Sequence, residues 1–155
     1  MATEIEHKYL VKADLWQEVT PHASVEVKQA YLVTDPDKTI RVRTMGDQAF
    51  ITIKGKASGA SRAEYEYEIP LQDAHELIHK FSSNLIEKVR HYVLHDTKTW
   101  EVDEFRGLNK GLVVAEIELA TEEETYALPA WIDKNVTHDH RDANSNLVSD
   151  PYINW

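Results

Sequence analysis

The stretch that decides the fold is Glu4-Ile5-Glu6-His7-Lys8-Tyr9-Leu10-Val11, close to the start of the chain. Charged and apolar side chains alternate along it, and alternation with period two is typical of a β-strand whose two faces have different surroundings. Glu4, Glu6 and Lys8 therefore share one face of this strand, and Ile5 lies on the other. The sequence predicts a strand with an ionic face and an apolar face.

Seven further stretches alternate in the same way or are rich in β-branched residues, so we expect eight strands in all. The seven stretches are residues 25–33, 39–43, 49–54, 62–69, 86–94, 99–105 and 112–119. The Gly/Ser/Ala segment from Gly55 to Ser61 predicts a hairpin connection between two of them.

Three helices are expected among the strands, at residues 12–19, 71–81 and 121–128. The second carries an apolar stripe at helical spacing, formed by Ala74, Leu77, Ile78 and Phe81. The third begins with Thr121 as a potential N-cap and continues with three glutamates, and acidic residues suit a helix N-terminus.

Strand periodicity places the charged residues of all these strands on one common face. The acids on it are Glu4, Glu6, Glu64, Glu66, Glu68, Asp103, Glu116 and Glu118, and the bases are Lys8, Arg41, Arg43, Lys54, Lys56, Arg62, Lys88 and Arg90. A solvated face of an ordinary antiparallel sheet is one interpretation. Like charges cluster here, however, and they repel each other unless something binds them. Paired carboxylates suit a divalent cation, and paired arginine and lysine side chains suit phosphate.

The composition excludes several classes of protein. A net charge of −10, from 17 basic and 27 acidic residues, disfavours indiscriminate binding to nucleic acid or anionic lipid. The absence of cysteine excludes disulfide frameworks and thiolate metal sites. No stretch reaches the roughly 18 apolar residues of a membrane span, and the first residues lack the apolar core of a signal peptide. We expect a single domain over residues 1–155, in the cytoplasm, with no nucleic-acid or membrane partner.

The motif Glu4-x-Glu6-x-Lys8 resembles the signature of the CYTH family, the triphosphate tunnel metalloenzymes. The resemblance continues in order along most of the chain, through Tyr31, Arg41-Val42-Arg43, Thr52-Ile53-Lys54, Arg62-Ala63-Glu64-Tyr65-Glu66, Lys88-Val89-Arg90, Trp100-Glu101-Val102-Asp103-Glu104-Phe105, Gly111-Leu112 and Ala115-Glu116-Ile117-Glu118-Leu119. After Val136-Thr137 the family tends to continue Asp-x-Arg-Tyr. Asp139 and Arg141 match this pattern, and Asp142 departs from it.

The resemblance implies a mainly β (α+β) fold, a closed eight-stranded antiparallel β-barrel that forms a tunnel with a charged interior and flanking helices outside. The residues implied to bind a triphosphate are Lys8, Arg41, Arg43, Lys54, Arg62, Lys88 and Arg90. Those implied to hold two divalent ions, Mg²⁺ or Mn²⁺, are Glu4, Glu6, Asp103, Glu116 and Glu118. Lys8 and Tyr31 are the implied catalytic residues, which position or activate the attacking water or stabilise developing charge. Glu64 and Glu66 are either ligand contacts or structural ion pairs.

The implied activity is metal-dependent hydrolysis of a small-molecule triphosphate. Inorganic triphosphate is the first expectation, because the motifs explain a phosphate site and none of them explains a base or sugar pocket. The alternatives are a nucleoside or thiamine triphosphatase, a class IV adenylate cyclase, and a non-catalytic polyphosphate- or nucleotide-binding barrel. A monomer and a homodimer both remain open.

A second motif, His75-Glu76-Leu77-Ile78-His79, has the spacing of a zinc-peptidase helix. The helical phase argues against this function, because Glu76 falls nearly opposite the apolar stripe while the two histidines fall at its edge. We therefore expect no zinc site there.

Overall fold

The computed structural model describes residues 3–82, 85–139, 144–147 and 150–155. The strands are β1 (Thr3–Val11), β2 (Ala23–Asp35), β3 (Lys38–Met45), β4 (Gln48–Gly55), β5 (Ser61–Ile69), β6 (Leu85–His95), β7 (Lys98–Phe105), β8 (Val113–Glu118) and β9 (Ile132–Asn135). The helices are α1 (Ala13–Trp16), α2 (Leu71–Phe81) and α3 (Asn144–Leu147), with 3-10 turns at Gly107–Asn109 and Tyr152–Asn154. No helix in these ranges is long and apolar enough to cross a membrane.

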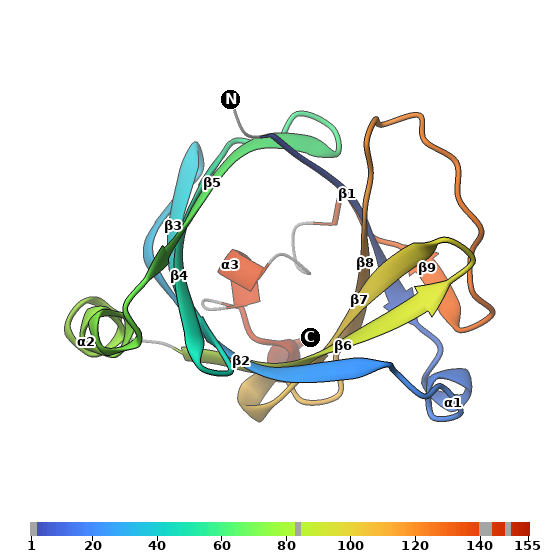
Figure 1. Cartoon of the computed structure of the whole chain (residues 1–155), viewed down its shortest axis with the longest axis horizontal. Coiled ribbons are helices and arrows are strands. Elements are labelled where there is room, and N and C mark those ends of the chain that lie inside the picture. The colour runs from blue at the N-terminus through green and yellow to red at the C-terminus, as the bar shows by residue number, and fades with distance from the viewer. Residues whose placement is uncertain (1–2, 83–84, 140–143, 148–149) are drawn as a thin grey trace.

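Eight of the strands close into an antiparallel barrel, which confirms the predicted fold (Figure 1). Their order is β5-β4-β3-β2-β6-β7-β8-β1, and the barrel closes where β1 pairs with β5 from Thr3↔Ala63 to Ile5↔Ser61. Beyond this point the same edge of β1 pairs with the short strand β9, at Tyr9↔Asn135. The sequence pattern did not reveal β9, because four residues are too few for alternation to be recognised.

The main apolar core lies outside the barrel wall rather than inside it. Trp100 and Trp131 meet edge to face at 6.0 Å between ring centroids, and Trp16 of α1 packs on Trp131 at 5.3 Å. These rings cover the outer faces of β1, β6, β7 and β8 together with Val102 and Ile117. Strand periodicity places the charged residues and the residues of this core on opposite faces. The charged face points inward, as the family resemblance implies.

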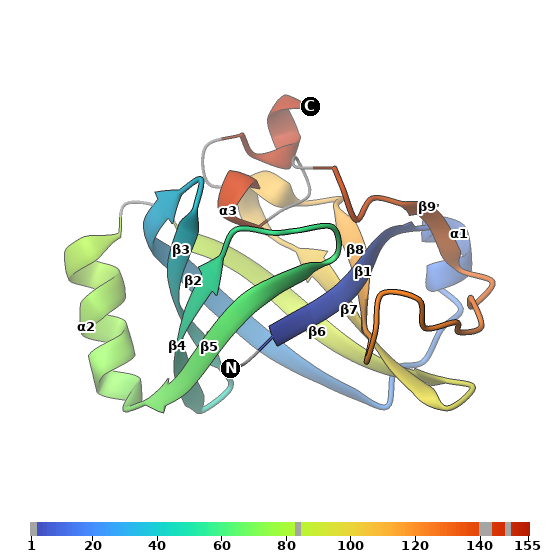
Figure 2. The same ribbon diagram turned by 90° about the horizontal axis from the view of Figure 1, so that it is seen from above.

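Helix α2 covers another part of the outer wall, against β2, β3 and β4 (Figures 1 and 2). Its bounds agree with the prediction, and Ala74, Leu77 and Ile78 pack against Val42 of the wall. Phe81 does not follow the predicted stripe: at the last residue of the helix it is 65% exposed.

The helix predicted at 121–128 is wrong; this segment is a turn followed by irregular backbone. Its acidic residues make other contacts: Glu124 accepts a hydrogen bond from Ala120 N at 2.7 Å and forms an ion pair with Lys98. Glu122 accepts one from Ala60 N at 2.9 Å, and Tyr126 is hydrogen-bonded to Tyr9 at 2.6 Å. These tertiary contacts outweigh the local helix signal. The first helix is also shorter than predicted, with four residues.

One end of the barrel interior is apolar and is covered by the C-terminal part of the chain (Figure 2). Leu147 of α3 packs there with Ile86, Phe105 and Val114, and Tyr152 packs against the same cluster. The interior is therefore charged over part of its length and apolar at this end.

Candidate active site

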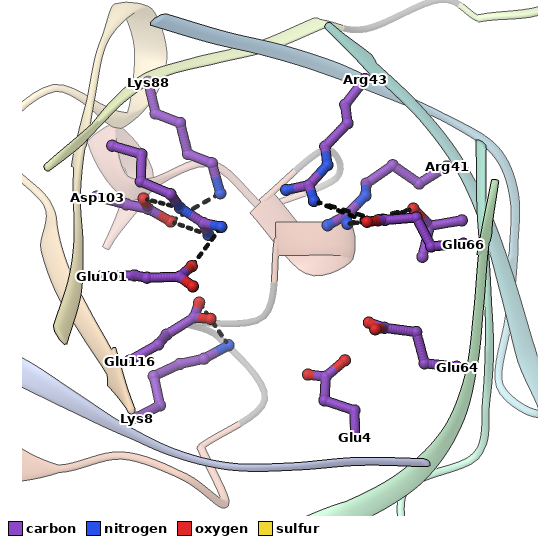
Figure 3. Close-up of polar contacts among 12 residues, drawn as sticks. Glu4, Lys8, Arg41, Arg43, Glu64, Glu66, Lys88, Glu101, Asp103 and Glu116 are labelled. Atoms are coloured by element: carbon purple, nitrogen blue, oxygen red, sulfur yellow. Dashed lines mark hydrogen bonds and ion pairs between the residues drawn. The ribbon is translucent and has the colours of Figure 1, made fainter. Parts of the chain in front are cut away.

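The charged part of the interior forms a cavity of about 230 Å³, which is smaller than the roughly 300–1,000 Å³ of pockets for drug-sized ligands. Side chains from several strands point into it (Figure 3). Its lining residues are Glu4, Glu6, Lys8, Tyr31, Thr39, Arg41, Arg43, Thr52, Lys54, Arg62, Glu64, Glu66, Arg90, Glu101, Glu116 and Glu118.

Two arginines of β3 and one glutamate of β5 form the first wall of the cavity. Arg43 Nη2 donates to both Glu66 oxygens, at 3.4 and 3.2 Å, and Arg41 Nη2 lies 3.7 Å from Glu66 Oε2. Thr52 Oγ1 donates to the same Oε2 at 2.6 Å. Burial lowers the pKa of Arg43, and the neighbouring charges of Arg41 and Arg90 lower it further. This wall is short of negative charge and suits an anion.

The opposite wall contains a buried cluster behind Arg90. Asp103 accepts a hydrogen bond from Lys88 Nζ at 2.8 Å and two from Arg90, from Nε at 2.9 Å and Nη2 at 3.0 Å. Both of its oxygens therefore accept hydrogen bonds. Burial opposes ionisation of Asp103, but the charges of Arg90 and Lys88 outweigh it and hold its pKa well below the usual range. Burial lowers the pKa of Lys88 to about 8. The cavity side of Arg90 pairs with Glu101.

Lys54 joins two carboxylates on the strands that close the barrel. Its Nζ lies 2.8 Å from Glu4 Oε2 and 3.3 Å from Glu64 Oε2. Burial raises the pKa of Glu64 to about 7, helped by its hydrogen bond with Glu4 and by the charge of that group. In Glu4 the same hydrogen bond and Lys54 outweigh burial and lower the pKa. The pair therefore shares one proton near neutral pH.

Lys8 lies on the acidic side of the cavity, with Nζ 3.9 Å from Glu116 Oε1. Burial favours its neutral form, but Glu116 and Glu6 outweigh burial and raise its pKa. Glu6 itself lies opposite Glu118 in the β1–β8 register. Burial raises the pKa of Glu6 well above the usual value, as do the charges of Glu116 and Glu4. This side of the cavity is short of positive charge.

The residues on the acidic side fit a divalent cation. Glu6 faces Glu118 across one strand pair and Glu101 faces Glu116 across the next, and such like-charged pairs are unfavourable without a cation. The donor set consists of carboxylate oxygens, which hard cations such as Mg²⁺ and Mn²⁺ prefer. Among the described residues, no three acidic or histidine side chains are already arranged as metal ligands. Two of the carboxylates pair with bases instead, Glu116 with Lys8 and Glu101 with Arg90.

Most of the predicted site residues line the cavity, and a few lie elsewhere. Lys88 was expected to bind phosphate and Asp103 to bind a metal ion. Each is 1% exposed, and they pair with each other behind the residues that line the cavity. Lys56 follows the end of β4 and is exposed, as is Glu68, which pairs with Gln48. Arg141 and Asp142 lie outside the described residues.

Sequence reasoning missed three residues that line the cavity, Thr39, Thr52 and Glu101. The signal for Glu101 was present, because it stands two positions before Asp103 and shares its face. The two threonines carry no charge, so they did not stand out on an ionic face. The zinc-like triplet His75, Glu76 and His79 is exposed on α2, outside the barrel.

Comparisons with known proteins agree with this architecture. The CYTH domain matches residues 2–150 of the chain. An inorganic triphosphatase of Acetivibrio thermocellus is 44% identical over 156 aligned positions, which cover 100% of this chain and 99% of that protein. Another, of Nitrosomonas europaea, is 34% identical over 150 positions, covering 94% and 97%. The crystal structure of an inorganic triphosphatase matches with a TM-score of 0.65 at 30% identity, covering 96% of this chain and 95% of that one. A family match over nearly the whole length, on a barrel with a charged interior, shows that this chain belongs to the CYTH family.

Proposed function

We propose that this chain hydrolyses inorganic triphosphate with the help of a divalent cation, Mg²⁺ or Mn²⁺. The observation that carries the proposal is the division of one small cavity into a cationic side, with Arg41, Arg43 and Arg90, and an acidic side around Glu6 and Glu116. A phosphate chain neutralises the first side, and a cation neutralises the second. The activity of the two relatives described above supports the same reaction here.

The bases of the cavity bind and orient the phosphate chain. Arg41 and Arg43 hold one phosphoryl group from β3, and Arg90 and Lys54 hold the chain from facing walls. Guanidinium groups suit this role because they present several donors in a fixed plane. Glu4, Glu6, Glu116 and Glu118 would hold the cation, which when bound supplies positive charge to phosphate oxygens and polarises a water.

Lys8 acts as a fixed cation in this proposal. Its raised pKa keeps Nζ protonated beside Glu116, so in this proposal it donates a hydrogen bond to a phosphate oxygen and does not accept a proton from water. It stabilises the negative charge that develops as the phosphoanhydride bond breaks. Tyr31, which lines the cavity opposite Arg41 in the β2–β3 register, positions the attacking water through its hydroxyl group.

Lys88 and Asp103 act as positioning residues in this proposal. Asp103 fixes Arg90 from behind through two hydrogen bonds, and Lys88 donates a third hydrogen bond to Asp103 Oδ2. Because the guanidinium is held before the substrate arrives, less of its side-chain entropy is lost on binding.

One assay panel tests the function. Inorganic triphosphate, pyrophosphate, ATP and thiamine triphosphate are each offered with Mg²⁺ or Mn²⁺, and phosphate and cyclic AMP are measured. We expect inorganic triphosphate to be hydrolysed fastest, because pyrophosphate leaves part of the basic set unpaired, and we expect no phosphate release in excess EDTA. Full turnover in EDTA, faster hydrolysis of pyrophosphate, or cyclic AMP as the main product from ATP would refute the proposal. Binding of triphosphate without turnover would favour a non-catalytic barrel.

A further inference from the structure

The carboxylate of Glu66 lies beside the guanidinium groups of both β3 arginines, Arg41 and Arg43 (Figure 3). One of its oxygens, Oε2, accepts a hydrogen bond from Thr52 Oγ1 at 2.6 Å and one from Arg43 Nη2 at 3.2 Å. The guanidinium of Arg41 lies 3.7 Å from the same oxygen. Two guanidinium groups and a hydroxyl around one oxygen form a set of donors that suits a phosphate oxygen equally well.

We propose that Glu66 is a built-in competitor of the substrate: its carboxylate occupies a phosphate subsite formed by Arg41, Arg43 and Thr52 until the substrate displaces it, and returns when the products leave. This inference rests on the proposed function and specifies one subsite of it. Thr52, whose hydroxyl is fully buried, becomes the uncharged member of the subsite.

The burial of these side chains indicates which of them moves. The side chains of Arg41 and Arg43 are 8% and 10% exposed, whereas that of Glu66 is 29% exposed to the cavity. The arginines are therefore held by the wall, and the glutamate has open space beside it. Burial opposes its ionisation, but the Thr52 hydrogen bond and the two arginines outweigh burial and lower its pKa. The competitor is thus fully charged at neutral pH.

A charged competitor weakens the binding of every anion that needs this subsite. Triphosphate retains useful affinity because it also reaches Arg90, on β6, and Lys54, two positions along β4 from Thr52. A single phosphate formed by hydrolysis has fewer contacts, so the return of Glu66 to the arginines expels it. The carboxylate therefore favours product release at the expense of substrate affinity.

The alternative role for Glu66 is a brace that orients the arginines for the substrate, and it predicts effects of opposite sign. The test measures binding of triphosphate, pyrophosphate and phosphate by calorimetry without metal, in the parent protein and in Glu66→Gln. We expect the substitution to tighten binding of all three anions by about 10- to 100-fold, the range that one charge-assisted contact covers. Product inhibition by phosphate during turnover should strengthen by a similar factor.

The matched control is Glu68→Gln, the same substitution two positions along β5 at an exposed residue that pairs with Gln48. It should leave all three affinities unchanged. If Glu66→Gln fails to fold, Glu66→Asp is measured instead; its shorter side chain retracts the carboxylate from the arginines, so it should tighten binding to a smaller degree. Unchanged or weaker anion binding in the folded variant overturns the proposal that Glu66 competes with the substrate. A parent protein that binds no triphosphate, with or without metal, overturns the proposed function as well.

Discussion

Replacing Asp103 with asparagine should show whether Asp103 anchors Arg90 or binds a metal ion. The substitution leaves Lys88, which is almost completely buried, without the charge that compensates it. Breaking a buried ion pair by removing one partner costs about 3–5 kcal/mol. One kcal/mol shifts the melting temperature of a chain of this size by roughly 2–4 °C, so we expect a fall of about 6–20 °C in the absence of ligand.

The effect should depend on pH in a direction that the structure fixes. Burial already lowers the pKa of Lys88 to about 8, and loss of Asp103, the main group that opposes burial, lowers it further. At pH 6.5 Lys88 is therefore protonated in the folded parent, and its ion pair with Asp103 contributes fully to stability. At pH 9 Lys88 is mostly neutral, and this contribution is largely lost. The destabilisation measured by urea unfolding should be larger at pH 6.5 than at pH 9.

The same variant should weaken triphosphate binding, because Arg90 loses its anchor. The control is the double variant Lys88→Met with Asp103→Leu, which removes the uncompensated amine. It should recover part of the stability and none of the affinity. A melting temperature within 2 °C of the parent, together with a higher cation requirement for turnover, would refute this reasoning and return Asp103 to the metal ligands; the 2 °C limit is about the shift from 1 kcal/mol.

Three further changes test other parts of the site. Arg43→Ala should lower triphosphate turnover by about 30- to 1,000-fold, equivalent to about 2–4 kcal/mol. It should change the ligand-free melting temperature little, because it also removes the repulsion of Arg43 with Arg41 and Arg90. Near-parental turnover would mean that these arginines form a solvated face and not a binding site. Glu64 holds its proton to about pH 7 when folded and to about pH 4.3 when unfolded, so it makes the metal-free protein less stable as pH rises between these values. Glu64→Gln should flatten that fall in urea titrations at pH 5 and 7.5, and an unchanged slope would contradict the shared proton. His75→Ala should leave triphosphate turnover at the parental rate, and lost activity would point to a site on α2.

The strand positions and the direction of the charged side chains could be predicted because both depend on a local rule. Side chains two apart share a face, so Arg41 and Arg43 had to point the same way, and Val42 between them the other way. The same rule places Glu101 on the face of Asp103, although we did not include it among the predicted site residues. Local rules failed at residues 121–128, where Glu122 and Glu124 each have a partner more than twenty residues away, in Ala60 and Lys98.

The pairing of the charges could not be predicted, because it depends on which strands are neighbours and in what register. Lys88 and Arg90 are equivalent by parity, yet Lys88 lies beside Phe105 near the apolar end and Arg90 reaches the cavity. The contact of Glu66 with Arg43 crosses β4, which separates β3 from β5 in the barrel. Sequence spacing contains neither fact.

Because the apolar core lies outside the barrel wall, most residues that stabilise the fold are different from those that face the cavity. Trp100 and Val102 are fully buried on the outer side of β7, while Glu101, between them in sequence, faces the cavity. A change at a cavity residue such as Arg43 therefore leaves the packing of the wall intact. The cluster behind Arg90 is different, because Lys88 and Asp103 are as buried as the core and hold an arginine that reaches the cavity. Stability and phosphate binding should thus fall together at Asp103, whose loss leaves Lys88 uncompensated, and separate at Arg43, whose loss also relieves repulsion with Arg41 and Arg90.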